Sequence, residues 1–174
     1  LVYDSHEYWP GIGVTGSVSN RAIVRLESEG IRAADRVMTV NPFIADMLRR
    51  DYRLPETPSV VMNCPLRDDT PVDTDTPGSP VRVLYQGKLQ AFRGIGELMR
   101  AFAVIEGATL TVSGDGPLLA RFRLMAEHEG LGGVVRFTGR YEPDETLDIV
   151  RGHDIGMLPF SPVTGNIVYS SPNK

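Results

Sequence analysis

Residues 81–117, VRVLYQGKLQAFRGIGELMRAFAVIEGATLTVSGDGP, decide the fold of this chain. Apolar residues from Val81 onward predict a strand that stops at Gly87. Four apolar residues then recur between Ile95 and Phe102 at the spacing of a single helical face. A second strand is predicted for residues 108–112. Strand, helix and strand in this order predict a βαβ unit, and therefore a parallel sheet.

The two loops of this unit carry the residue types of an anion site. Lys88 and Arg93 follow the first strand, and Gly94 lets the backbone turn into the helix. Ser113-Gly114-Asp115-Gly116 follows the second strand. Strand ends that carry glycines and cations, next to helix N-termini, are where α/β sheets bind phosphorylated ligands. The stretch therefore predicts a phosphate-handling α/β domain.

Length and composition set bounds on the rest. The chain has 174 residues, 41% of them hydrophobic and 23% charged, which is typical of a globular protein of one or two domains. Its net charge of -4 gives no global basic field for nucleic acid, so any cation site is local. The single cysteine, Cys64, excludes an internal disulfide framework, and we expect it to be a small buried residue in a reducing compartment. No apolar run reaches the length of a membrane span.

Residues 11–16, GIGVTG, match the dinucleotide-binding pattern G-x-G-x-x-G literally. That motif needs a strand running straight into it and an acidic residue about twenty positions later, at the end of the second strand. Here six residues that include Pro10 separate it from the strand predicted for residues 1–4, and the next predicted strand ends at Asn41. We therefore interpret residues 11–16 as a glycine loop.

Strands and helices alternate along the whole chain. Strands are predicted at 1–4, 37–40, 59–62, 134–137 and 154–158, helices at 20–35, 118–130, 143–150 and from Asn41-Pro42 onward, and a loop at 160–174. In the helix of residues 20–35 the expected apolar positions are Ile23, Leu26 and Ile31, with Gly30 as a break. Residues 65–80 are rich in Asp, Thr and Pro and lack periodicity, which is typical of a linker. We predict two domains, residues 1–64 and 81–174, joined by this linker.

These segments, in this order, resemble the retaining glycosyltransferases of the GT-B fold, and within them the large family-four group that uses nucleotide-diphosphate sugars. YDSHE, ADRVMTVN and VVMNCP resemble the second half of the family's acceptor-side domain. YQGKL with RG, VSGDGP, FTGRY with ETLDIV, DIGMLP and SPNK resemble its donor-side domain. The resemblance implies a GT-B fold of two Rossmann-like parallel-sheet domains, both incomplete here. In similar proteins the SPNK segment runs into a helix that begins LFEY.

The resemblance assigns roles to the cations of the first loop. Lys88 and Arg93 would stabilise the charge that develops on the nucleotide diphosphate as it leaves, in place of a metal ion. Family members often carry arginine at the position of Lys88 and lysine at that of Arg93, a swap that keeps charge but changes geometry. On this basis Arg93→Ala should lower kcat/KM at least roughly a hundredfold.

Other roles also follow from the resemblance. Gly87, Gly94, Gly114 and Gly116 would let the backbone approach the donor, with ordinary turn glycines as the alternative. Arg140 and Tyr141 would contact the base, while Pro172, Asn173 and Lys174 would offer N–H groups to the distal phosphate. His6 would contact the transferred sugar, with Asp4 or Glu7 as an acceptor base and Trp9 in the acceptor cleft or in the core.

Two further interpretations concern the remaining histidines and one departure from the family pattern. His128 and His153 lack metal-ligand spacing, so we interpret them as surface or packing residues. The first of the family's paired glutamates falls on Tyr169, which can donate a hydrogen bond but carries no negative charge.

The resemblance implies sugar transfer from a UDP- or GDP-sugar with retention of configuration, as in hexosyltransferases of glycan biosynthesis, with no cofactor and no metal. The partners would be the nucleotide-sugar donor and a glycan, lipid-linked or small-molecule acceptor, without nucleic acid. The expected location is the cytoplasm, free or peripheral at the membrane surface. Two alternatives stay open: a nucleotide-sugar epimerase of the same fold, and a non-catalytic nucleotide-binding module.

Overall fold

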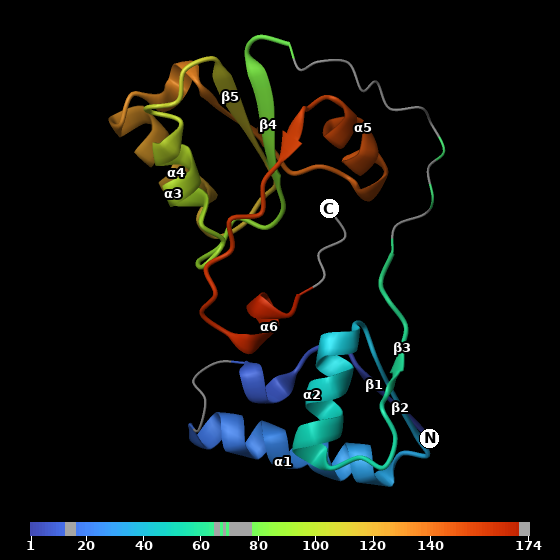
Figure 1. The fold of residues 1–174 in the computed structure, drawn as a ribbon. Helices are drawn as coiled ribbons and strands as arrows, with labels where there is room; N and C mark the ends of the chain where they lie inside the picture. Colours follow the sequence, from blue (N-terminus) through green and yellow to red (C-terminus); the bar gives the residue numbers. More distant parts are fainter. Residues whose placement is uncertain (13–16, 65–66, 68, 70–77, 171–174) are drawn as a thin grey trace. The chain divides into compact units, whose positions relative to one another are not determined.

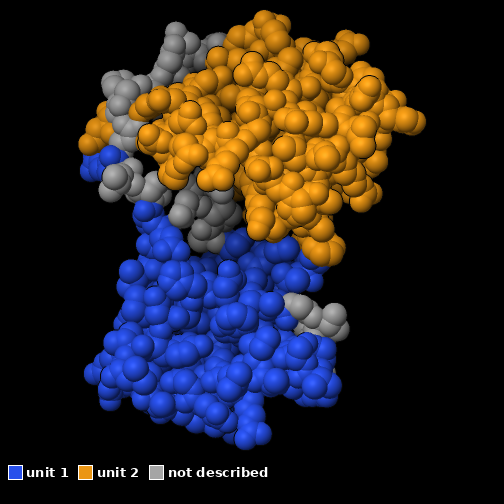
Figure 2. All heavy atoms as spheres, turned by 180° about the vertical axis from the view of Figure 1, so that it is seen from behind, with its two compact units in different colours: residues 1–67, 162–173 blue, residues 68–161, 174 orange. Residues whose placement is uncertain are grey.

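The computed structural model describes residues 1–12, 17–64, 67, 69 and 78–170. The chain forms two compact units, coloured separately in Figure 2. Unit 1 comprises residues 1–67 and 162–173, and unit 2 comprises residues 68–161 and 174. Each unit contains one parallel sheet with helices packed on it, so the predicted α/β class is confirmed.

Unit 1 has a sheet of three parallel strands, in the order β1-β2-β3. The strands are β1 (Val2–Ser5), β2 (Arg36–Thr39) and β3 (Ser59–Val60). Two helices cross over between them, α1 (Val18–Ala33) and α2 (Pro42–Tyr52), and a short 3-10 helix, η1, spans Trp9–Gly11 (Figure 1). The predicted cap of α2 is confirmed, because the backbone N–H of Ile44 donates to the Asn41 side-chain oxygen over 2.9 Å.

Helix α1 differs from its prediction in two ways. It runs without a break through Gly30, whose role is close packing: a Cβ there would lie 2.9 Å from the Tyr3 ring. Its buried face includes Ile31 and the acidic Glu27, whereas Leu26, predicted as an apolar contact, is 68% exposed. The prediction of Leu26 was wrong because a carboxylate at the neighbouring position occupies the interior.

Unit 2 has a sheet of four parallel strands, in the order β6-β5-β4-β7. Its strands are β4 (Val81–Gln86), β5 (Ala108–Ser113), β6 (Val135–Gly139) and β7 (Ile155–Gly156). Its helices are α3 (Ile95–Ala101), α4 (Leu119–His128) and α5 (Thr146–Arg151), with 3-10 turns η2 (Leu131–Gly133) and η3 (Pro143–Glu145). Helices α3 and α4 lie on one side of the sheet and α5 on the other (Figure 1). The βαβ unit predicted from residues 81–117 is confirmed.

The core of unit 2 lies on the α3–α4 side of the sheet. Alternate strand residues such as Tyr85 and Val112 point into it and are at most 1% exposed. Met99 of α3 and Phe122 of α4 pack against them. The opposite face of the sheet carries polar residues, among them Thr111. Most of the hydrophobic core of this unit therefore lies on one face of the sheet.

The chain returns to unit 1 after Ser161. The loop predicted for residues 160–174 contains a short helix, α6 (Gly165–Val168), which Thr164 caps. The Asn166 side-chain oxygen accepts a 2.8 Å bond from the Tyr8 backbone N–H, and the Asn41 amide donates over 2.8 Å to the Tyr169 carbonyl. These contacts hold residues 162–170 in unit 1, although the sequence had placed them in the second domain.

Three smaller features complete the fold. Strands β3 and β7 contain two residues each, fewer than predicted. Cys64 is exposed, so its predicted burial was wrong, because the chain leaves the sheet after β3. Within the described residues no helix has both the length and the apolar character needed to cross a bilayer.

Candidate nucleotide-binding site

The loops that follow β4, β5 and β6 lie side by side and are joined by backbone hydrogen bonds. The N–H of Gly87 donates to the Ser113 carbonyl over 2.9 Å, and the N–H of Gly114 donates to the Gly139 carbonyl over 2.8 Å. Further along, Leu89 donates to the Asp115 carbonyl over 2.9 Å. The carboxyl edge of the sheet is thus a continuous, backbone-braced platform.

An open hollow of about 320 Å³ lies on this platform. It is lined by Gly87, Lys88, Gly114, Asp115, Arg140, Tyr141, Pro143 and Thr146. Five of the residues singled out from the sequence therefore meet at one place, although they come from three separate loops. Parallel strand order explains this, because adjacent parallel strands end at the same edge.

The hollow has mixed charge with a cationic excess. Lys88 is exposed, and Arg140 makes only a loose, exposed ion pair with Glu142, 3.6 Å between Nε and Oε1. Asp115 is the one carboxylate among the lining residues, and its Oδ1 accepts a 2.7 Å bond from the N–H of Gly116. Exposed ion pairs contribute little, so Arg140 can exchange Glu142 for an anionic ligand at small cost.

A buried tyrosine fixes the backbone of Lys88. The hydroxyl of Tyr85, 1% exposed, donates to the Lys88 carbonyl over 3.1 Å. Burial raises the pKa of Tyr85 to about 12, against a smaller lowering effect of the Arg93 charge. The phenol therefore stays protonated at neutral pH and remains a donor. Lys88 consequently sits on a fixed backbone, and its side chain is exposed to solvent.

The glycines of these loops are needed for close contacts between the loops. A Cβ on Gly114, whose φ is +140°, would lie 1.9 Å from the Gly87 carbonyl oxygen. A Cβ on Gly94, at φ +65°, would lie 1.8 Å from the Pro159 carbonyl oxygen, and one on Gly116 would lie 2.4 Å from that of Leu89. Backbone packing thus gives these three glycines a sufficient structural reason, the alternative that the sequence left open.

Arg93 does not line the hollow that contains Lys88. Its guanidinium lies over the ring of Phe160, 4.3 Å from the ring centroid. The same junction is held by a 3.0 Å bond from the Ser161 N–H to the Phe92 carbonyl. The structure therefore places the two predicted cations at different points of one loop.

The remaining predicted residues lie in unit 1 or outside the described residues. His6 follows β1 and is exposed; its Nε2 donates to Asp4 over 3.0 Å. Glu7 is exposed, and Trp9 is half-buried in η1. Pro172, Asn173 and Lys174 lie outside the described residues, as do residues 13–16 of the glycine loop.

Sequence reasoning missed one polar cluster, centred on Glu27 in unit 1. This carboxylate is 3% exposed and accepts hydrogen bonds from Tyr52 and, over 3.3 Å, from Ser5. Burial raises the pKa of Glu27 above its usual value, and the hydrogen bonds oppose that rise. The signal was visible, because Glu27 lies four residues from both Ile23 and Ile31 and so shares their helical face.

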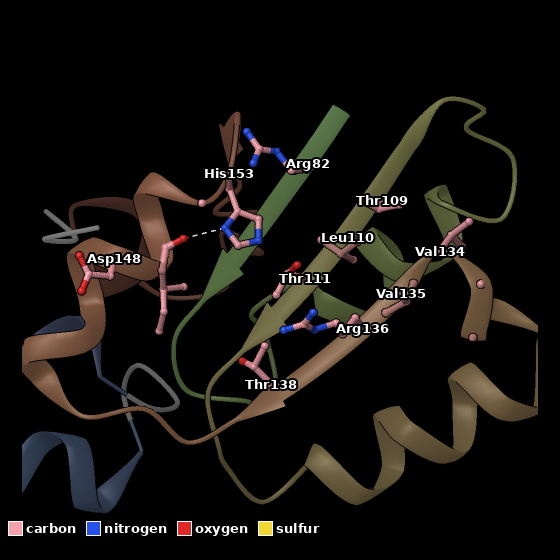
Figure 3. Close-up of a pocket in the computed structure, with 14 residues that line it drawn as sticks. Arg82, Thr109, Leu110, Thr111, Val134, Val135, Arg136, Thr138, Asp148 and His153 are labelled. Carbon is pink, nitrogen blue, oxygen red and sulfur yellow. Dashed lines mark hydrogen bonds between the residues drawn. The ribbon is translucent and has the colours of Figure 1, made fainter. Parts of the chain in front are cut away.

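A second cavity, of about 730 Å³, lies on the polar face of the unit 2 sheet (Figure 3). Thr109, Thr111 and Arg136 point into it from the sheet, and His153 reaches it from the end of α5. His153 Nδ1 donates to the Ile149 carbonyl over 2.7 Å, a packing role that agrees with its interpretation from sequence. None of the residues predicted to bind the donor lines this cavity.

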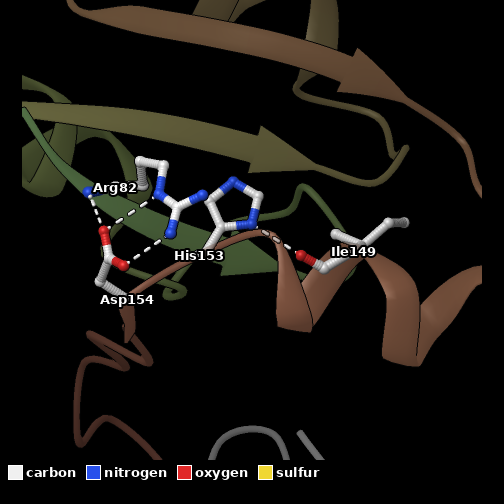
Figure 4. Close-up of polar contacts among 4 residues, drawn as sticks. All are labelled: Arg82, Ile149, His153 and Asp154. Atoms are coloured by element: carbon white, nitrogen blue, oxygen red, sulfur yellow. Dashed lines mark hydrogen bonds and ion pairs between the residues drawn. The ribbon is translucent and has the colours of Figure 1, made fainter. Parts of the chain in front are cut away.

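An ion pair next to this cavity ties the edge strand to the sheet (Figure 4). Arg82 on β4 donates to Asp154, just before β7, through Nη2 over 2.8 Å, Nε over 3.1 Å and its backbone N–H over 2.7 Å. These bonds lower the pKa of Asp154 to about 2. Among the described residues, no group of three or more His, Cys, Asp or Glu could hold a metal ion.

Solved structures with the same fold are GT-B glycosyltransferases. The lipopolysaccharide outer core galactosyltransferase WaaB is 21% identical over 71% of this chain and 35% of its own, with a TM-score of 0.55. S. aureus TarM, solved with UDP, fondaparinux and alpha-GlcNAc-glycerol, is 9% identical over 89% and 31%, with a TM-score of 0.67. Anabaena HepE, in complex with UDP and glucose, is 16% identical over 89% and 45%, with a TM-score of 0.62.

The chain spans less than half the length of each of these proteins. No protein-family model matches it, and no curated protein matches it. At these identities the similarity establishes the fold, which is GT-B, as the sequence predicted.

Proposed function

We propose that this chain is part of a glycosyltransferase that binds a nucleotide-diphosphate sugar at the carboxyl edge of the unit 2 sheet. The observation that carries the proposal is the hollow in which Lys88, Arg140 and three loop backbones converge. Open α/β sheets bind ligands outside the carboxyl ends of their strands, and this edge presents two cations, Lys88 and Arg140, beside one carboxylate of the lining. The solved structures of the same fold include complexes with UDP.

The proposed chemistry is electrostatic. As the glycosidic bond breaks, negative charge grows on the diphosphate, and a fixed cation nearby stabilises that charge more strongly than it stabilises the bound substrate. Lys88 is the first candidate because its backbone is fixed by Tyr85 while its side chain faces the hollow. Arg93 would join it by leaving the Phe160 ring, a contact of about 0.5–2 kcal/mol for this half-buried pair.

The finer features of the reaction rest on the family resemblance. We propose that the configuration of the sugar is retained, that no metal is needed, and that the acceptor is a glycan, with His6 near the transferred sugar. The intact enzyme would work in the cytoplasm. Nuclear magnetic resonance of the product's anomeric proton tests retention, and activity that survives a chelator tests metal independence; a chelator that abolishes transfer would contradict the latter.

Calorimetric titration with UDP and GDP tests the central part of the proposal. Lys88→Ala should weaken diphosphate binding roughly tenfold, the worth of one charge-assisted hydrogen bond. Arg123→Ala, on an exposed part of α4, is the matched control and should bind as the unmodified chain does. In an active enzyme Arg93→Ala should lower kcat/KM roughly a hundredfold or more. Binding of neither nucleotide, or equal binding by Lys88→Ala, would overturn the assignment.

A non-catalytic nucleotide-binding module is the second candidate, and Tyr169 is the observation that favours it. This tyrosine stands where the resemblance expects a glutamate, and its ring packs 6.2 Å from that of Phe43. Because Tyr169 has no carboxylate and packs against Phe43, it supplies no negative charge to a donor sugar. Nucleotide binding without hydrolysis or transfer of any UDP- or GDP-sugar would support this candidate.

A further inference from the structure

Unit 1 contains a groove whose lining includes none of the residues discussed as donor contacts. It has a volume of about 680 Å³ and runs between helix α1 and the end of helix α2. Pro10, the α1 residues from Asn20 to Arg32, and residues 51–53 contribute its lining. Because one unit provides the whole lining, the groove exists irrespective of how the two units are arranged.

Arginines form both walls of this arginine groove. Arg21, Arg25 and Arg32 are spaced by four and seven residues, which puts them on one side of α1, and Arg53 stands on the opposite wall. At 1.5 Å per residue the α1 row is about 16 Å long, which exceeds the length of a single sugar ring. The cations therefore form a track along the groove.

The carboxylates of the groove are already paired. Glu29 makes a 3.0 Å ion pair with Arg25, and Asp51 makes a 2.6 Å ion pair with Arg50. The Arg50 hydrogen bond lowers the pKa of Asp51, and the Tyr8 hydroxyl also donates to this carboxylate. The groove thus keeps an excess of guanidinium groups at neutral pH, although the chain as a whole carries a net charge of -4.

The groove also has apolar surface between the charges. Val24 and the half-buried Tyr52 belong to its lining, with Pro10 as a further apolar residue. The Tyr52 hydroxyl donates to buried Glu27, which fixes its ring in place. A sugar ring presents apolar C–H faces and polar edges, whereas a bare phosphate offers no apolar surface to such a lining.

We propose that the arginine groove binds an acidic linear glycan, with its carboxylate, sulfate or phosphate groups on the arginine forks and its ring faces on Tyr52 and Val24. Guanidinium forks suit such planar or tetrahedral anions. A concave groove fits a chain better than it fits the flat surface of a bilayer. The binding stands on these contacts alone; that the glycan is the acceptor rests on the proposed glycosyltransferase function.

Binding of a heparin-derived oligosaccharide, measured by calorimetry on the 174-residue chain, tests the proposal. Arg21→Gln with Arg32→Gln should weaken this binding at least tenfold. Arg121→Gln with Arg123→Gln, which removes two exposed charges from the α4 region of unit 2, is the matched control and should leave it unchanged. Arg53→Asn, which suits the left-handed backbone at φ 53°, tests the second wall independently of α1.

Several outcomes would overturn the proposal: no binding by the unmodified chain, equal losses in the groove and control variants, or equal binding of an uncharged dextran oligosaccharide. Binding to phosphatidylglycerol vesicles without binding to the oligosaccharide would replace the glycan by a membrane surface. Titration of each variant with UDP separates this proposal from the donor site. The groove variants should bind UDP as the unmodified chain does. If the unmodified chain binds the oligosaccharide but not UDP, only the proposed function is contradicted.

Discussion

The carboxyl edge of the unit 2 sheet and the end of β1 in unit 1 are held in place by different means. In unit 2 the loops are joined by backbone hydrogen bonds, and glycines bring them close together. In unit 1 hydrogen bonds of buried side chains hold the end of β1 in place. Ser5 donates to Glu27, and Thr39 donates to the Ser5 carbonyl over 2.7 Å. A backbone-braced edge leaves its side chains available to a ligand, whereas the side-chain network is fully used in holding the fold.

The largest expected effect is on the backbone bracing of unit 2. In Gly114→Ala the new methyl group would lie 1.9 Å from the Gly87 carbonyl oxygen, at a φ of +140° that L residues rarely adopt. We expect a loss of stability on the order of 3 kcal/mol, measured by urea denaturation. Gly132→Ala, with no atom within 4 Å of the added carbon, is the control and should stay within about 0.5 kcal/mol. Equal stability of both variants would show that the loops are not braced in this way.

The next effect concerns the side-chain network of unit 1. Glu27→Ala leaves the Tyr52 hydroxyl without its buried acceptor, whereas Ser5 keeps its 2.9 Å bond to the Glu7 carbonyl. The substitution should cost about 2–3 kcal/mol of unfolding free energy. Glu29→Ala, two residues along the same helix, removes only an exposed ion pair with Arg25 and should cost less than about 0.5 kcal/mol. If the two variants lose similar amounts, Glu27 is not the anchor of this end of unit 1.

The smallest effect is a difference in pH dependence between two carboxylates. Burial raises the pKa of Glu27, so its contribution is fully present below the usual value of 4.5 and is lost as pH rises through the raised value. Ion pairing lowers the pKa of Asp154 to about 2, so its contribution is present above 3.8 and is lost as pH falls toward 2.

Denaturation curves recorded from pH 2 to 7 check these opposite signs. Glu27→Gln should flatten the decline of stability above pH 4.5, and Asp154→Asn should flatten the decline below pH 4. A Glu27→Gln variant that instead flattens the acid limb would mean that the carboxylate is stabilised in its charged form in the folded state.

The sequence predicted the parallel sheets from local periodicity, whereas the family resemblance assigned the five site residues that line the hollow to one ligand. It could not predict that Arg93 stacks on Phe160, since that contact joins positions 67 residues apart. Nor could it choose between ligand approach and loop packing for Gly94 and Gly114, because both need the same residue type. Glu27 was missed because an acidic side chain on an apolar face is ordinarily assigned to solvent.

The most direct test of the central claim is a residue-resolved titration of the chain with UDP, followed by amide chemical shifts in nuclear magnetic resonance. We expect the shifts that change to lie at Gly87, Lys88, Gly114 and Gly116 and at Arg140 and Tyr141, the loops around the unit 2 hollow. Unchanged shifts there, with changes instead at Thr109 and Thr111 of the polar sheet face, would contradict the claim that this edge binds the nucleotide.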